Sequence, residues 1–235
     1  PPTAASAGTD LNGMAAARAC RKLKERLAKV ATKMLNGPRL PPDPEKICFF
    51  KGWVWDSRKQ ENTLGFAEIV RQAWIERVSL GERGFYRTPN IDFDRESGQG
   101  NPFYYYTMGA AVSEVRIDRF IGKLKLERVD IQMDIGESIH QGIDLGQTYG
   151  GFVQGLGWLT TEELRYSDKG TLLSYSPTTY KIPNISDIPE HFHVEFVQNP
   201  GHSINIRRSK AVGEPPLMLS LSVWLAVKHA LSCAA

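Results

Sequence analysis

The residue with the clearest chemical potential is Glu214, which stands between a glycine and two prolines. Gly213 lets the backbone approach a ligand closely, while Pro215 and Pro216 lack N–H donors and fix φ, which suits a first helical turn. The apolar run 217–227 that follows is typical of a buried helix. Glu214 is therefore expected at a helix N-terminus, where the partial positive charge favours the ionised carboxylate that a general base requires. On spacing alone, an ordinary acidic residue at a helix end is the commoner explanation.

A second candidate is Gln147, in a segment, 143–164, whose apolar residues recur at helical spacing although glycines interrupt it. Each interior glycine costs a helix about 1 kcal/mol relative to alanine, so these glycines need a packing or ligand reason. Close approach to a cofactor or to another backbone would supply one. The Gln147 amide offers a donor and an acceptor to a planar heterocycle, although a surface polar residue is the commoner explanation for an isolated glutamine.

Four separated segments resemble, in order along the chain, the molybdenum hydroxylases, the family of xanthine dehydrogenases and aldehyde oxidases. They are PTAAS at 2–6, GFYRTPN at 84–90, the group IDLGQ, GFVQGLG and TEEL within 143–164, and KAVGEPPL at 210–217. The sequences of these segments resemble those of xanthine dehydrogenases more than those of aldehyde oxidases. The resemblance implies hydroxylation of a purine such as hypoxanthine or xanthine, with Glu214 deprotonating a Mo–OH group, the oxygen attacking carbon, and a hydride passing to Mo=S.

The same resemblance implies a set of residues around a molybdenum–molybdopterin cofactor. Glu214 would be the catalytic base, and the cofactor-binding residues would be Ala4, Ala5, Ser6, Thr9, Gln147 and Gly213. The backbone of Ala5 would lie near the molybdenum, and Ser6 and Thr9 near the phosphates of the pterin. No iron–sulfur or flavin motif occurs in the sequence, so those cofactors are expected on other domains or subunits.

The chain opens on Pro1 without an initiator methionine, which suggests a processed chain or a piece of a longer one. We expect residues 1–235 to be the C-terminal portion of the molybdopterin-binding region, inactive alone, with the upstream region as its partner and a dimer as the assembled enzyme. The alternative is a noncatalytic C-terminal assembly module or truncated homologue that binds no cofactor alone. Molybdenum analysis of the assembled protein separates the two.

Composition points to a soluble globular protein, with 41% hydrophobic and 23% charged residues among 235. A net charge of +3 is too small to indicate nucleic-acid binding. The three cysteines form no CxxC pair, which fits a reducing, cytoplasmic location, and neither a leader peptide nor an apolar run of membrane-spanning length is evident. The basic residues of the first helix are most simply explained as a solvated face.

The pattern of elements predicts an α+β fold, with hairpins and a mixed sheet packed with helices. Alternating residues in 129–135 predict the return strand of a hairpin with 103–118, and 192–196 predicts a further strand. One helix is expected from an N-cap at Thr9 or Asp10 to Gly37-Pro38, with an apolar stripe at 11–27, and a second over 66–78. The aromatic stretch within 39–62 lacks clear alternation and is interpreted as a possible insertion relative to the family.

Overall fold

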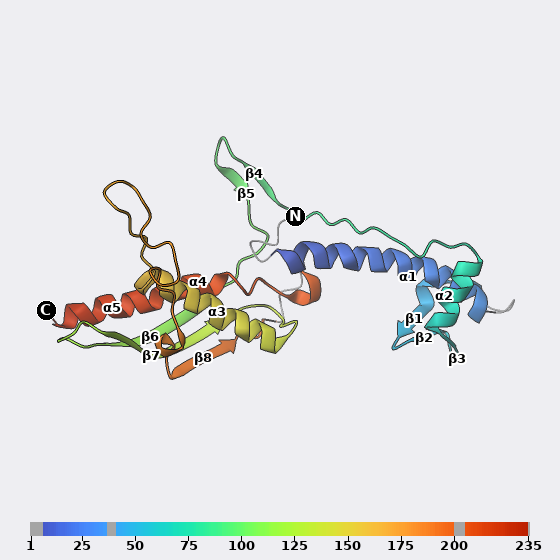
Figure 1. Cartoon of the computed structure of the whole chain (residues 1–235). Coiled ribbons are helices and arrows are strands. Elements are labelled where there is room, and N and C mark those ends of the chain that lie inside the picture. The colour runs from blue at the N-terminus through green and yellow to red at the C-terminus, as the bar shows by residue number, and fades with distance from the viewer. Residues whose placement is uncertain (1–6, 37–40, 200–204, 235) are drawn as a thin grey trace. The chain divides into compact units, whose positions relative to one another are not determined.

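The computed structural model describes residues 7–36, 41–199 and 205–234. The chain divides into two compact units (Figure 1). The N-terminal unit is Gly8–Thr88, and the described part of the C-terminal unit consists of the chain from Pro89 onwards together with Ala7. Ala4, Ala5 and Ser6 lie outside the described residues.

The N-terminal unit packs two helices against a small antiparallel sheet. A π-helical turn, Gly8–Gly13, runs into α1, Met14–Leu35, and α2 is Phe66–Ile75. Strands β1 (Ile47–Phe50), β2 (Trp53–Asp56) and β3 (Lys59–Gly65) form the sheet in that order. The cap expected at Thr9 or Asp10 is wrong, because the helical path already begins at Gly8. The core consists of Leu27, Ala28, Val30, Ala31, Leu35, Ile47, Val54, Ile69 and Ala73.

Basic side chains on α1 bind an extended segment, 79–86, that follows α2. Arg18 donates to the carbonyl of Phe85 (3.0 Å) and Lys22 to that of Arg83 (3.3 Å), and Arg26 donates to the carbonyl of Ser79 (2.7 Å). Arg26 also forms an ion pair with Glu82. The expectation of a solvated basic face is therefore incomplete: Arg18 and Lys22 are exposed, but all three side chains also donate to carbonyl groups of the same unit.

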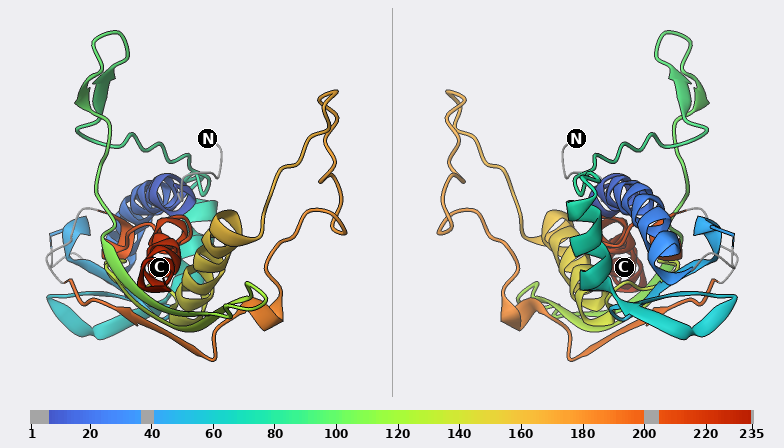
Figure 2. Two further views of the ribbon diagram at one scale, coloured as in Figure 1. Left: turned by 90° about the vertical axis from the view of Figure 1, so that its left-hand side faces the viewer. Right: turned by 90° about the vertical axis from the view of Figure 1, so that its right-hand side faces the viewer.

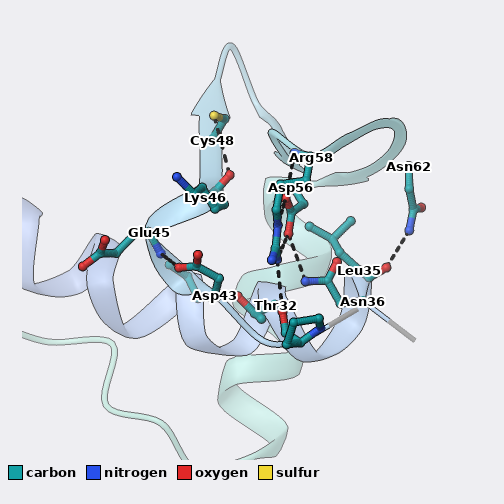
Figure 3. A network of polar contacts seen from close by, with 12 residues as sticks. Thr32, Leu35, Asn36, Asp43, Glu45, Lys46, Cys48, Asp56, Arg58 and Asn62 are labelled. Atoms are coloured by element: carbon teal, nitrogen blue, oxygen red, sulfur yellow. Dashed lines mark hydrogen bonds and ion pairs between the residues drawn. The ribbon is translucent and has the colours of Figure 1, made fainter. Parts of the chain in front are cut away.

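A buried carboxylate joins the end of α1 to the hairpin of β2 and β3 (Figure 3). Asp56 accepts hydrogen bonds from Arg58 Nε (2.9 Å) and Nη2 (2.6 Å), from the Arg58 backbone N–H (2.9 Å) and from Asn36 Nδ2 (2.9 Å). The hydrogen bond from the Arg58 side chain is the main reason why the pKa of Asp56 lies far below its usual value, and it outweighs the opposing effect of burial.

A mixed sheet forms the centre of the C-terminal unit. Its strands are β6 (Gly109–Ile117), β7 (Leu124–Met133) and β8 (His191–Phe196), in the order β6-β7-β8. The antiparallel pairing of β6 with β7 confirms the predicted hairpin, and β8 pairs with β7 in parallel. A short hairpin of β4 (Asp92–Asp94) and β5 (Gln99–Asn101) precedes the sheet, and 3₁₀ turns occupy Pro44–Lys46, Ile185–Asp187 and Ile206–Arg208.

Three helices complete the C-terminal unit: α3 (Gln141–Thr160), α4 (Pro215–Leu219) and α5 (Leu221–Ala234). Figure 2 shows α3 and α5 lying over the same face of the sheet. Apolar residues from this face and these helices form a single core, which contains Leu126, Val129, Ile131, Met133, Ile135, Phe152, Leu156, Val194 and Val223. The mixture of helices, hairpins and a mixed sheet confirms the α+β class.

Helix α5 is less buried than its sequence suggests. Val223 is fully buried against the sheet, but Leu225 and Leu231 are 58% and 57% exposed. The expectation of a buried helix is therefore wrong within this chain, because the sheet covers one side of the helix and leaves the other open. By length and composition the stretch Pro215–Ala234 could also cross a membrane, contrary to expectation, but one such stretch is weak evidence and core helices meet the same criterion.

Candidate functional site at the turn before helix α4

Glu214 lies on the turn that enters α4, with its side chain exposed. Pro215 occupies the first helical position, as expected, and the backbone N–H of Leu217 donates to the Glu214 carbonyl (3.1 Å). The helix itself spans only Pro215–Leu219 before the chain turns at Ser220 into α5. The expected helix N-terminus is therefore present at Glu214, although the first helical segment is only five residues long.

Two glycines of α3 let the turn and α4 approach very closely. A Cβ at position 151 would lie 2.8 Å from the Gly213 carbonyl oxygen, and one at position 155 would lie 2.4 Å from the Leu217 carbonyl oxygen. Both distances are shorter than an ordinary contact of a Cβ atom, and the backbone atoms concerned have little freedom to move away. Close approach of another backbone, one of the two explanations expected for the glycines of this helix, therefore applies to Gly151 and Gly155.

A different side of α3 is open. A Cβ at Gly146 or at Gly150 would meet no other atom within 4 Å. Gln147 is exposed and precedes Gly150 by three residues and Gly151 by four, so it lies one helical turn from both. Gln147 thus lies between the open side of α3 and the side that packs against Gly213, whereas Thr9 is an exposed residue of the N-terminal unit.

The chain reaches this turn from a buried ion pair that sequence reasoning missed. Lys210 Nζ lies 2.5 Å from Asp134 Oδ2, and the two side chains are only 6% and 11% exposed. Asp134 also accepts hydrogen bonds from Asn199 Nδ2 (2.7 Å) and from the Gly136 N–H (2.9 Å). Burial alone raises the pKa of Asp134, but the hydrogen bonds from Lys210, Asn199 and Gly136 outweigh it and hold the pKa below its usual value.

Backbone contacts reinforce the pair where β7 ends. The Lys210 N–H donates to the Ile135 carbonyl (2.7 Å), and the Glu137 N–H donates to the Arg208 carbonyl (2.9 Å). Gly136 adopts a positive φ of 66°, and a Cβ there would lie 2.2 Å from the Arg208 carbonyl oxygen. Sequence patterns do not predict an ion pair between residues 76 positions apart. The available signal was that Lys210 belongs to the same KAVGEPPL segment as Glu214.

Comparisons with known proteins agree on one family. The family model for the molybdopterin cofactor-binding domain matches residues 1–189. The chain is 41% identical to a xanthine dehydrogenase of Oryza sativa subsp. japonica and 42% identical to a xanthine dehydrogenase/oxidase of Rattus norvegicus, over 99% of this chain in each case. It spans 16% of the length of each of these relatives.

Solved structures share the fold. Quinoline 2-oxidoreductase from Pseudomonas putida 86 superposes with a TM-score of 0.79 at 22% identity, over 97% of this chain and 28% of that one. The aldehyde oxidoreductase from Desulfovibrio desulfuricans superposes with a TM-score of 0.69 at 23% identity, over 94% of this chain and 20% of that one.

Proposed function

Since the chain belongs to the family of molybdopterin cofactor-binding domains, we propose that it forms the C-terminal portion of the molybdenum-binding region of a xanthine dehydrogenase-like enzyme that oxidises purines. The observation that carries the proposal is the exposed side chain of Glu214 on a turn packed against α3, the helix that also carries Gln147. Purines are proposed as substrates because the relatives that cover nearly the whole chain at about 40% identity are xanthine dehydrogenases.

The open side of α3 fits a flat, conjugated cofactor. Gly146 and Gly150 place no side chain there, and the Gln147 amide can both donate to and accept from the polar edge of a ring. When bound, the molybdenum–molybdopterin cofactor supplies oxygen transfer and two-electron oxidation, which side chains cannot supply. Further cofactor contacts are proposed on the family resemblance, at Ala4, Ala5, Ser6, Thr9 and Gly213, with the Ala5 backbone nearest the metal.

Glu214 is proposed as the general base. Its carboxylate accepts the proton of the oxygen that attacks the substrate carbon, and its exposed position leaves it accessible to a ligand. The turn holds the carboxylate through Gly213, whose carbonyl packs against α3 at Gly151. The role of the protein is thus to place one proton acceptor and to exclude other orientations.

The remaining cofactors and partners are proposed to lie elsewhere in the full protein. Iron–sulfur clusters and FAD would carry the electrons away from the molybdenum centre, in a cytoplasmic enzyme that assembles as a dimer. The exposed apolar side chains of α5, including Trp224, Leu225 and Leu231, are available for contact with the upstream molybdenum-binding region.

The test is Glu214→Gln in the full-length, molybdenum-containing protein. Gln keeps the shape of Glu but accepts no proton, so the single-turnover rate of reduction by xanthine should fall about 10²–10⁴-fold, with molybdenum content and melting temperature unchanged. Glu190→Gln, which changes an exposed carboxylate away from the turn, serves as the control. A loss of less than tenfold in fully loaded Glu214→Gln enzyme removes the catalytic role, and absence of molybdenum from the full-length protein favours a noncatalytic assembly module.

A further inference from the structure

We propose that Asp134 and Lys210 are positioning residues for Glu214: their buried ion pair fixes the start of the segment 210–213, so that the carboxylate four residues later has one orientation toward substrate. The inference rests on the proposed function of Glu214 as the general base.

The buried Asp134 carboxylate is well supplied with hydrogen-bond donors. Asp134 receives three donors: Lys210, Asn199 and the Gly136 N–H, at 2.5–2.9 Å. Removing two charges from water costs several kcal/mol for each ion, and well-packed apolar residues often stabilise a protein as well or better. A pair of this kind therefore needs a reason other than stability, and a fixed position for the adjoining chain is one.

Other contacts also hold the segment from Lys210 to Glu214: the Lys210 N–H donates to the Ile135 carbonyl (2.7 Å), and Val212 packs against the core. The Thr107 hydroxyl donates to the Ala211 carbonyl (3.2 Å), and the Gly213 carbonyl packs against α3 at Gly151. These contacts restrain the backbone from two sides, but the side chain of Lys210 ties it to the end of β7, which belongs to the central sheet. Loss of the ion pair leaves the backbone hydrogen bond of Lys210 to Ile135, the hydroxyl contact and the packing against α3 to hold the turn.

A small displacement of the turn matters because general-base catalysis depends on position. Misplacing a reacting group by about 1 Å can cost about 10²-fold in rate, even when the change lies outside the reacting centre. Neither Lys210 nor Asp134 needs to touch substrate or cofactor for this effect. Their expected signature is a lower rate of reduction with cofactor and fold retained.

The main variant is Asp134→Asn/Lys210→Met in the full-length, molybdenum-containing protein, since it removes both charges and leaves no buried ion unpaired. We expect the single-turnover rate of reduction by xanthine to fall about 10–100-fold, while molybdenum content and the melting temperature stay near those of the wild type. Glu137→Gln is the matched control, because it removes the exposed ion pair with Arg208 between the same two segments. The control should change the rate less than twofold.

A double-mutant cycle with Glu214→Gln separates positioning from general structural damage. If the ion pair acts through Glu214, adding Asp134→Asn/Lys210→Met to Glu214→Gln lowers the rate no further. An equal additional loss in the Glu214→Gln background overturns the inference and leaves the role of Glu214 intact. A Glu214→Gln variant that keeps full activity instead overturns the proposed function itself.

The single Asp134→Asn variant is a second measurement on the same pair. It keeps the shape of the side chain and an acceptor for Lys210 but leaves the Lys210 ammonium without its counter-ion, so we expect a lower melting temperature and, in folded protein, a loss of reduction rate of about threefold to tenfold. An unchanged rate in folded, molybdenum-loaded Asp134→Asn protein, with the acid limb of its pH–rate profile also unchanged, overturns the inference.

Discussion

Asp56 in the N-terminal unit and Asp134 in the C-terminal unit are both buried carboxylates paired with a basic side chain. The partner of Asp56 is Arg58, two residues away on the same hairpin, with its side chain 27% exposed. The partner of Asp134 is Lys210, 76 residues away, with its side chain 6% exposed. The chemistry is similar, but one pair closes a local turn and the other joins segments that chain entropy would otherwise separate.

The difference indicates two uses for a buried ion pair. Arg58 reaches Asp56 without any long-range folding, so the pair shapes its own hairpin and the neighbouring end of α1 at Asn36. Lys210 reaches Asp134 only when β7 and the segment before α4 have come together. Damage to the first pair should stay within the N-terminal unit, whereas damage to the second should reach Glu214.

The largest expected effect comes from breaking each pair at its cation. Lys210→Met leaves the Asp134 carboxylate buried without its cation, which should cost about 3–5 kcal/mol and lower the melting temperature on the order of 10 °C. Arg58→Met should lower it less, because the partly exposed Arg58 site admits water to the carboxylate. Differential scanning calorimetry of both variants measures the contrast, and equal losses would show that the exposure of the basic side chain does not decide the cost.

A contrast between neighbouring glycines tests whether backbone contact also holds the C-terminal unit together. Gly151→Ala should cost about 1–3 kcal/mol, because its Cβ meets the Gly213 carbonyl. Gly150→Ala should instead stabilise the cofactor-free protein by about 0.4–1 kcal/mol, because its Cβ meets open space on a helix. Urea unfolding measures the change in the free energy of unfolding of each variant, which should be negative for Gly151→Ala and positive for Gly150→Ala. If the open side of α3 binds the cofactor, Gly150→Ala also lowers the molybdenum content of the full-length protein.

The pH dependence of stability sharpens the comparison further. Both carboxyls have pKa values lowered by folding, so the stability they contribute is fully present above the unfolded-state pKa of about 3.9 and is lost as the pH falls through the folded-state pKa. Asp56→Asn should therefore lower the melting temperature most at neutral pH, and its difference from the wild type should narrow below about pH 4. A difference that stays constant from pH 7 to pH 2 contradicts the assignment.

The smallest expected effect belongs to an exposed ion pair of the same local type as Asp56 and Arg58. Arg128 pairs with Asp130 two residues along β7, but both side chains are substantially exposed. Arg128→Met should leave the melting temperature unchanged within error, because solvent already screens the pair. A clear loss would mean that local geometry, rather than burial, gives the Asp56 pair its strength.

Local patterns predicted the parts of the fold that depend on nearby residues. The alternation of Val129, Ile131 and Met133 identified β7 and its hairpin with β6, and the glycine–proline context placed Glu214 on a turn before a helix. The parallel pairing of β8 with β7 could not be predicted, since it joins strands about 60 residues apart. The strands of the aromatic stretch were missed because their apolar residues do not alternate, and whether 39–62 is an insertion stays a prediction.

The candidate site shows the same division. Gln147 and Glu214 were found because they stand in recognisable segments, and the glycines of α3 were noted as needing close approach. Which glycines face α4 and which face open space depends on the helix that packs against them, and the partner of Lys210 depends on the sheet. Long-range packing therefore decided what the sequence left open.

The contacts of α1 limit the sequence of the segment 79–86 at few positions. Arg18, Lys22 and Arg26 bind the carbonyl groups of the extended segment 79–86, and carbonyl groups are the same whatever the side chains. The helix thus binds mainly the backbone of the segment, and the side chains of Glu82 and Tyr86 add contacts with Arg26 and Arg18. Position 84 tolerates only glycine, because a Cβ there would lie 1.7 Å from the Ala15 carbonyl oxygen. Sequence drift is therefore expected to be broad along this segment and to stop at position 84.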